Sequence, residues 1–238
     1  MRRRLVLGAL ALAGCAATKH AAPPAAAAHA TPVVAPLSGT WMRPIGSGVA
    51  GREGVSFAPD GSLGLVGIQI MSGISWRVEG DALIVTTSSP HSAAAVESRL
   101  HIEELGAERL RLSADAEYLA GSYQRDDAAA ARVTGSVTYL QRIALPPDAA
   151  VQVALWDTSR AGDARLVARE IVPTAGRQVP IPFALTYATA DIDASHPYAL
   201  EASIVAGGEL RFQSAAATPV ITQGHPVAVE LVVEPAGG

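Results

Sequence analysis

The sequence contains very little cysteine, lysine or aromatic side chain. It has one cysteine, Cys15, and one lysine, Lys19, and Phe, Trp and Tyr make up 5% of its 238 residues. A single cysteine excludes an internal disulfide, so Cys15 calls for another role. No apolar run beyond the first residues approaches the roughly 20 residues that a transmembrane helix needs.

An excess of positive charge is also missing. The formal net charge is −4, and three arginines lie among the first four residues, so the rest of the chain is more acidic still. An acidic protein does not recruit nucleic acid or anionic headgroups by overall charge, so we expect no nucleic-acid partner.

The first fifteen residues have the pattern of a bacterial lipoprotein leader. Arg2–Arg4 precede the apolar run Leu5–Ala13, which ends in Leu12-Ala13-Gly14-Cys15. Small residues let a peptidase approach the bond between Gly14 and Cys15, and the thiol can accept a diacylglycerol group. We therefore predict a signal peptide over residues 1–14 and lipid attachment at Cys15. The alternative is an incidental thiol in a cleaved leader.

A tether is expected over residues 15–36. The segment consists largely of alanine and proline and lacks large apolar side chains to bury. Its histidines, His20 and His29, could be metal ligands, although solvated side chains are the simpler interpretation. Ala16 stands where an aspartate would favour inner-membrane retention, which predicts a periplasm-facing protein anchored in the outer membrane.

Residues 37–127 read as a run of short strands. Apolar and polar residues alternate in segments such as Val55–Phe57 and Ile74–Val78, and turns such as Asp60-Gly61 and Gly80-Asp81 separate them. This pattern is typical of antiparallel strands and predicts a small barrel. The polar and alanine-rich joint 126–131 follows as the expected domain boundary.

Residues 132–235 hold a second set of strands. Seven alternating segments in about 100 residues predict a seven-stranded β-sandwich and an all-β protein. Pro180 and Pro182 share one parity of their segment, and neither can donate a ladder hydrogen bond. We expect this segment to be an edge strand.

The second segment resembles the YbaY-like family, which includes the YscW-type pilot lipoproteins of type III secretion. The similarity is carried by Gly135–Tyr139, Arg142–Ala149, Val179–Phe183, Tyr198 and Leu210–Phe212. The resemblance implies an envelope lipoprotein, and its pilot branch implies a chaperone that escorts a secretin. It implies no enzymatic activity.

The first segment is similar to small lipocalin-like domains of envelope lipoproteins. The matching pieces are Gly39-Thr40-Trp41, Phe57 with Asp60-Gly61, Trp76 before Gly80–Leu83, and Tyr123–Arg125. This resemblance implies a barrel that could enclose a ligand. Trp41, Phe57 and Trp76 are the candidate pocket residues, and plain core packing is the competing interpretation.

No catalytic constellation is evident. Glycine-flanked serine elbows are absent, and His91, His101, His196 and His225 are dispersed, so neither a triad nor a metal or cofactor site is expected. Asp191 and Asp193 could form a calcium corner, but capping of a turn is simpler. Glu103 and Glu104 should point to opposite faces of a strand, as a solvated pair.

Three functions are compatible with these features. The first is a non-catalytic envelope lipoprotein that acts on an unidentified envelope protein as an assembly, pilot or chaperone-like accessory factor. The second is the binding of a small apolar ligand or lipid in the N-terminal barrel. The third, an enzyme acting on envelope polymers, would require a convergent acid–base pair.

Overall fold

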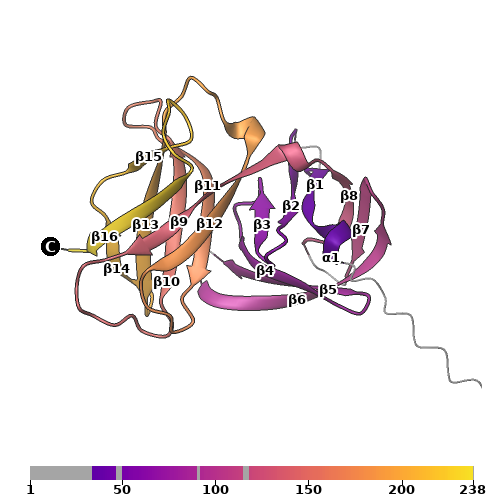
Figure 1. Cartoon of the computed structure of the whole chain (residues 1–238), viewed down its shortest axis with the longest axis horizontal. Coiled ribbons are helices and arrows are strands. Elements are labelled where there is room, and N and C mark those ends of the chain that lie inside the picture. The colour runs from indigo at the N-terminus through magenta and orange to yellow at the C-terminus, as the bar shows by residue number, and fades with distance from the viewer. Residues whose placement is uncertain (1–33, 47–49, 90–91, 115–117, 238) are drawn as a thin grey trace, which may run out of the picture. The chain divides into compact units, whose positions relative to one another are not determined.

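Figure 1 shows the computed structural model, which describes residues 34–46, 50–89, 92–114 and 118–237. Strands dominate these residues, and the helical parts are the short α1 (Val34–Leu37) and the 3-10 turns η1 (Asp127–Ala129) and η2 (Thr189–Asp191). None of the described helices is long and apolar enough to span a bilayer. The predicted all-β class is confirmed.

The first eight strands form one antiparallel sheet. Along it the order is β3-β2-β1-β8-β7-β6-β5-β4. The strands are β1 (Gly39–Pro44), β2 (Arg52–Phe57), β3 (Leu63–Val66), β4 (Ser72–Glu79), β5 (Ala82–Ser89), β6 (Ser92–Leu105), β7 (Arg109–Ser113) and β8 (Gly121–Arg125).

The two ends of this sheet come close together. Ser62 and Ser75 form an isolated antiparallel bridge, and the Trp76 amide donates to the Gly61 carbonyl oxygen at 2.9 Å. The sheet is therefore a nearly closed barrel, as predicted. Its interior is filled by the alternating apolar residues of the strands, such as Val55, Leu83 and Leu100, which are at most 1% exposed.

The remaining strands form a second, nearly closed sheet. Its path is β11-β10-β13-β14-β16-β9-β12, with β15 paired to β13 beside that path. The strands are β9 (Ala130–Thr138), β10 (Ala150–Asp157), β11 (Arg165–Pro173), β12 (Ile181–Ala188), β13 (Tyr198–Ala206), β14 (Glu209–Ser214), β15 (Thr218–Val220) and β16 (Ala228–Pro235).

The path has the seven strands that the sequence predicts, and β15 is an eighth that the sequence analysis missed. The seven strands run on as one curved sheet, because β16 pairs with both β14 and β9. The β9–β16 pair is parallel, although the other pairs of this sheet are antiparallel. Its core is made by inward-facing residues such as Val153, Leu185 and Leu200, each fully buried.

The predicted edge strand is confirmed at β12. This strand ends the hydrogen-bonded path and pairs with β9 alone, with Pro182 opposite Ser136. On its other side, the Ala184 amide donates to the Glu170 carboxylate of β11 at 3.0 Å. A side chain thus bridges the gap between β11 and β12, where no ladder forms.

Candidate functional site

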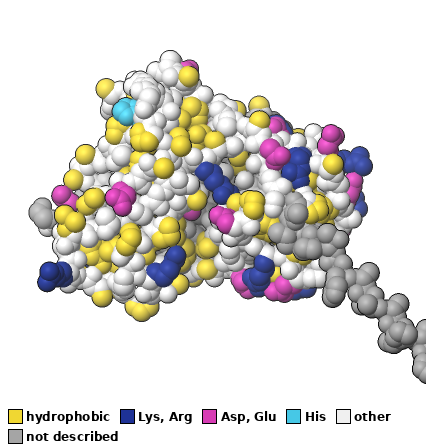
Figure 2. All heavy atoms as spheres, viewed as in Figure 1, with side chains coloured by type: hydrophobic (Ala, Val, Ile, Leu, Met, Phe, Trp, Pro, Cys, Tyr) yellow, Lys and Arg dark blue, Asp and Glu magenta, His cyan; other side chains and the backbone are white. Residues whose placement is uncertain are grey.

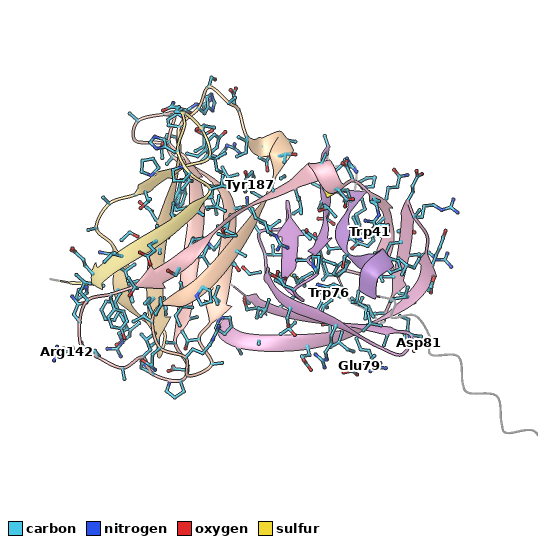
Figure 3. The ribbon with its side chains drawn as sticks, viewed as in Figure 1. Trp41, Trp76, Glu79, Asp81, Arg142 and Tyr187 are labelled. Carbon is cyan, nitrogen blue, oxygen red and sulfur yellow. The ribbon has the colours of Figure 1, made fainter. Side chains whose placement is uncertain are left out.

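The three aromatic residues singled out from the sequence lie in the interior of the first barrel. Trp41, Phe57 and Trp76 are 0%, 1% and 5% exposed. The rings of Phe57 and Trp76 meet edge to face, with 5.2 Å between their centroids. In Figure 3 the two labelled tryptophans lie among the strands of this barrel, whereas Glu79 and Asp81 lie at its end.

Both indole nitrogens of this cluster have acceptors in the protein. Trp41 Nε1 donates to the carbonyl oxygen of Leu37 at 2.7 Å, and Trp76 Nε1 donates to that of Ala58 at 2.9 Å. The Arg125 guanidinium covers the Trp41 ring at 4.3 Å from its centroid. Such contacts are typical of a packed core, and a ligand pocket at these residues stays a prediction.

Cys15 and Gly14, the residues assigned to lipid attachment and signal cleavage, lie outside the described residues, as do His20, His29 and His91. Lipid attachment at Cys15 therefore remains a prediction from the sequence.

A charged group at one end of the first barrel was missed by the sequence analysis. The Arg43 guanidinium contacts the Glu53 carboxylate at 2.8 Å, and the Tyr118 hydroxyl donates to the same carboxylate at 2.6 Å. Arg43 also lies 5.0 Å from the centroid of the Tyr123 ring. Burial raises the pKa of Tyr123 to about 12. Glu53 lies between Arg52 and Gly54 in the sequence, so its immediate neighbours gave no sign that it would be buried and paired.

A cleft of about 650 Å³ opens where loops of the second sheet meet. Its charged and polar lining comes from the end of β10, the following loop and the β12–β13 connection, and includes Asp157, Arg160, Arg165, Asp193, His196 and Tyr198. At its base, His196 Nδ1 lies 3.0 Å from a carboxylate oxygen of Asp157. These two residues are 39 positions apart, so sequence spacing could not reveal their contact.

The Asp157 carboxylate is held in its ionised form. Burial alone would raise its pKa, but hydrogen bonds from the amide and side chain of Ser159 and from His196 lower the pKa to about 2. The pair lacks a nucleophile, because among the described residues no hydroxyl or thiol donates to the His196 ring. Its evident role is to tie two loops together.

The acidic residues with alternative interpretations have structural partners. One Asp193 carboxylate oxygen accepts hydrogen bonds from the Ser195 amide at 2.8 Å and the Ser195 hydroxyl at 2.6 Å, which is turn capping. Glu103 and Glu104 pair with Arg111 and Arg109, at 2.6 and 2.9 Å. In the described parts of the chain, no three His, Cys, Asp or Glu residues converge as a metal site.

A second cleft, of about 630 Å³, lies on the outside of the first barrel over β1, β7 and β8. Its arginines are already engaged: Arg52 pairs with Asp126 at 2.6 Å and Arg109 with Glu104 at 2.9 Å. Because these charges are neutralised within the protein, the cleft offers no free cationic site.

Comparison with known proteins divides the chain at the same place as the two sheets. Residues 34–126 match the lipocalin-like family, and residues 128–233 match the family described as type III secretion system lipoprotein chaperone, YscW. Both resemblances seen in the sequence are thereby confirmed.

A curated protein is similar to part of the chain. The chain is 38% identical over 93 residues to the uncharacterized lipoprotein YbaY of Escherichia coli strain K12. The match covers 39% of this chain and 49% of that protein, so the chain spans about half the length of this curated relative.

Two solved structures are also similar to parts of the chain. An alternative pilotin from the type II secretion system of Vibrio cholerae is 39% identical, with a TM-score of 0.44, covering 46% of this chain and 99% of that one. A lipocalin-like protein from Bacteroides thetaiotaomicron is 23% identical, with a TM-score of 0.33, covering 38% and 96%.

Proposed function

We propose that this protein is a non-catalytic accessory lipoprotein of the cell envelope, anchored through acylated Cys15, that binds and escorts or stabilises another envelope protein. The observation that carries the proposal is the match of residues 128–233 to a family of lipoprotein chaperones. The match to the lipoprotein YbaY supports the same class.

Features of the chain support the anchored part of the proposal. The sequence Leu12-Ala13-Gly14-Cys15 follows a short apolar run and three arginines, which is the pattern of a lipoprotein leader. Acyl chains on Cys15 would hold the protein at the membrane, since each buried methylene contributes about 0.8 kcal/mol. The absence of an aspartate after Cys15 supports sorting to the outer membrane, and we propose that the protein faces the periplasm there.

The first sheet takes a supporting part in this proposal. Its buried aromatic cluster is hydrogen-bonded and packed, and its outer arginines are paired with acids. A small apolar ligand in this barrel is the alternative function, and it requires that the packing around Trp41, Phe57 and Trp76 opens to admit it.

The test compares the full-length protein with Cys15→Ala in cells. We expect the wild type to incorporate fatty acid and to fractionate with the outer membrane, and the variant to do neither. Crosslinking in intact cells should then capture a defined envelope protein with the wild type, whose amount in the outer membrane falls when the gene is deleted. A Cys15→Ala variant that still fractionates with the outer membrane would refute anchoring through Cys15. An unchanged amount of the captured protein in the outer membrane after the deletion would refute the escort function.

A further inference from the structure

A hollow with unpaired charges lies on the outer face of the second sheet. Its volume is about 330 Å³, and its lining comes from β10, β11, β13 and β14. We call it the β10 hollow and define it by Gln152, Ala154, Trp156, Arg169, Glu201 and Gln213. It lies on the opposite face of β10 from Val153 and Leu155, which point into the core.

The strand register explains the shape of the hollow. Ala154 of the central strand β10 is directly opposite Arg169 of β11 on one side and Glu201 of β13 on the other. Because Ala154 carries only a methyl group, the surface between the longer side chains of Arg169 and Glu201 is recessed. Two strand spacings separate Arg169 from Glu201, which is about 10 Å between their backbones.

The two charges of the hollow have no ion-pair partner in the part of the chain that the structure describes. Neither Arg169 nor Glu201 belongs to an ion pair among the described residues. On the first sheet the opposite holds: arginines such as Arg77 and Arg99 are ion-paired, and Figure 2 shows charges of both signs side by side over its strands.

Neutral polar groups of the hollow are also free. The side chains of Gln152, Ser203 and Gln213 make no hydrogen bond within the described residues, and Trp156 Nε1 is buried without an acceptor. Amide side chains supply both donors and acceptors. A surface that offers a cation, an anion and free amides in one concavity is complementary to a polypeptide, because a polypeptide supplies side chains of both charges together with backbone amide groups.

We infer that the β10 hollow binds a polypeptide segment of a partner that presents an acidic and a basic side chain about 10 Å apart on one face. The acidic side chain lies against Arg169 and the basic one against Glu201. The inference rests on the proposed function, because it assigns the surface and the chemistry by which the accessory protein recognises its partner. The Trp156 ring and the half-exposed Leu210 add apolar contact at the rim.

The probe for this inference is a random peptide library selected on the full chain. We expect the enriched peptides to carry an acid and a base at a constant separation. Arg169→Glu and Glu201→Arg should each lower the binding affinity for a selected peptide by tenfold or more, which corresponds to about 1.4 kcal/mol. The variant that carries both substitutions should bind a peptide in which the acidic and the basic residue have exchanged places. Arg142→Glu and Glu230→Arg, on exposed positions outside the hollow, serve as matched controls.

Tryptophan fluorescence gives an independent readout. Trp41 and Trp76 are buried in the first sheet, so a change in emission on peptide binding should arise from Trp156 and disappear in Trp156→Phe. The inference is overturned if no peptide is enriched or if binding survives both charge reversals. It is also overturned if the chain associates with itself and Arg169→Glu abolishes that association, because the hollow would then bind a second copy of the chain.

Failure of this inference can be told apart from failure of the proposed function. If the envelope partner is still captured equally by wild type and Arg169→Glu, the proposed function holds and the β10 hollow is not the docking surface. If charge-matched peptides bind at the hollow but crosslinking in cells captures no envelope partner, the binding site is supported and the proposed escort function is refuted.

Discussion

The indole nitrogen of Trp41 donates a hydrogen bond to the carbonyl oxygen of Leu37 at 2.7 Å, and both residues are fully buried. Leu37 is the last residue of α1, and Trp41 belongs to β1. The bond therefore closes the start of the described chain onto the barrel, and it makes a clear test of the core.

We expect Trp41→Phe to lower the free energy of unfolding by about 1 to 3 kcal/mol, because the Leu37 carbonyl oxygen would stay buried without its donor. Chemical denaturation measures the change. The matched control is Trp156→Phe, since Trp156 Nε1 has no acceptor to lose. Equal losses in the two variants would show that ring size, and not the hydrogen bond, sets the cost.

Glu170 should make the protein less stable as the pH rises. Burial raises the pKa of this carboxyl to about 7 from 4.5, although the Ala184 amide opposes the shift. The unfolded chain loses the proton near its ordinary pKa while the folded protein retains it to about 7, so stability falls between these values and stays low above them.

Glu170→Gln removes this titration and keeps an oxygen for the Ala184 amide. We expect the variant to match the wild type near pH 4 and to exceed it by about 2 to 3 kcal/mol near pH 8. Unfolding midpoints at the two pH values provide the measurement, with exposed Glu201→Gln as the control. A constant difference across the range would contradict the titration of Glu170.

Asp157 should act in the opposite direction. Its pKa is lowered to about 2, so its contribution to stability is present above the unfolded value of 3.8 and is lost as the pH falls toward 2. We expect Asp157→Asn to lower the thermal midpoint at pH 7 and to leave it nearly unchanged at pH 2. Asp163→Asn, in the same cleft, is the control. An undiminished loss at pH 2 would assign the effect to packing.

Gly135 lies where β9 and β16 pair in parallel. A Cβ atom at this position would overlap the Val229 carbonyl oxygen of β16 and crowd the Phe183 ring. We expect Gly135→Ala to destabilise the protein by about 2 to 4 kcal/mol, as overpacking against backbone does. Thermal unfolding of the two variants provides the measurement. At Gly106 the nearest atom is 3.7 Å from an added Cβ, so the control Gly106→Ala should lower the stability far less.

Many of the strands could be predicted because apolar and polar residues alternate along them. Segments such as Val55–Phe57 and Leu110–Leu112 bury one parity of side chains, and Pro182 marks its strand as an edge. The short β15 escaped because three residues around Pro219 show too little alternation to read.

The chemistry of the surfaces could not be predicted in the same way. The contact of Asp157 with His196 and the row of Arg169, Ala154 and Glu201 depend on register between distant strands. Glu170 is partly buried although its charge argues for exposure, because its carboxylate accepts the Ala184 amide across the gap between β11 and β12.

The parallel pairing of β9 with β16 joins the first and last strands of the second sheet. A ribosome releases β9 early and β16 last, so the chain between them must wait for its closing strand before this sheet can be completed. β14 and β9 are thus linked only after β16 has been made, so the closure of this sheet depends on its final strand.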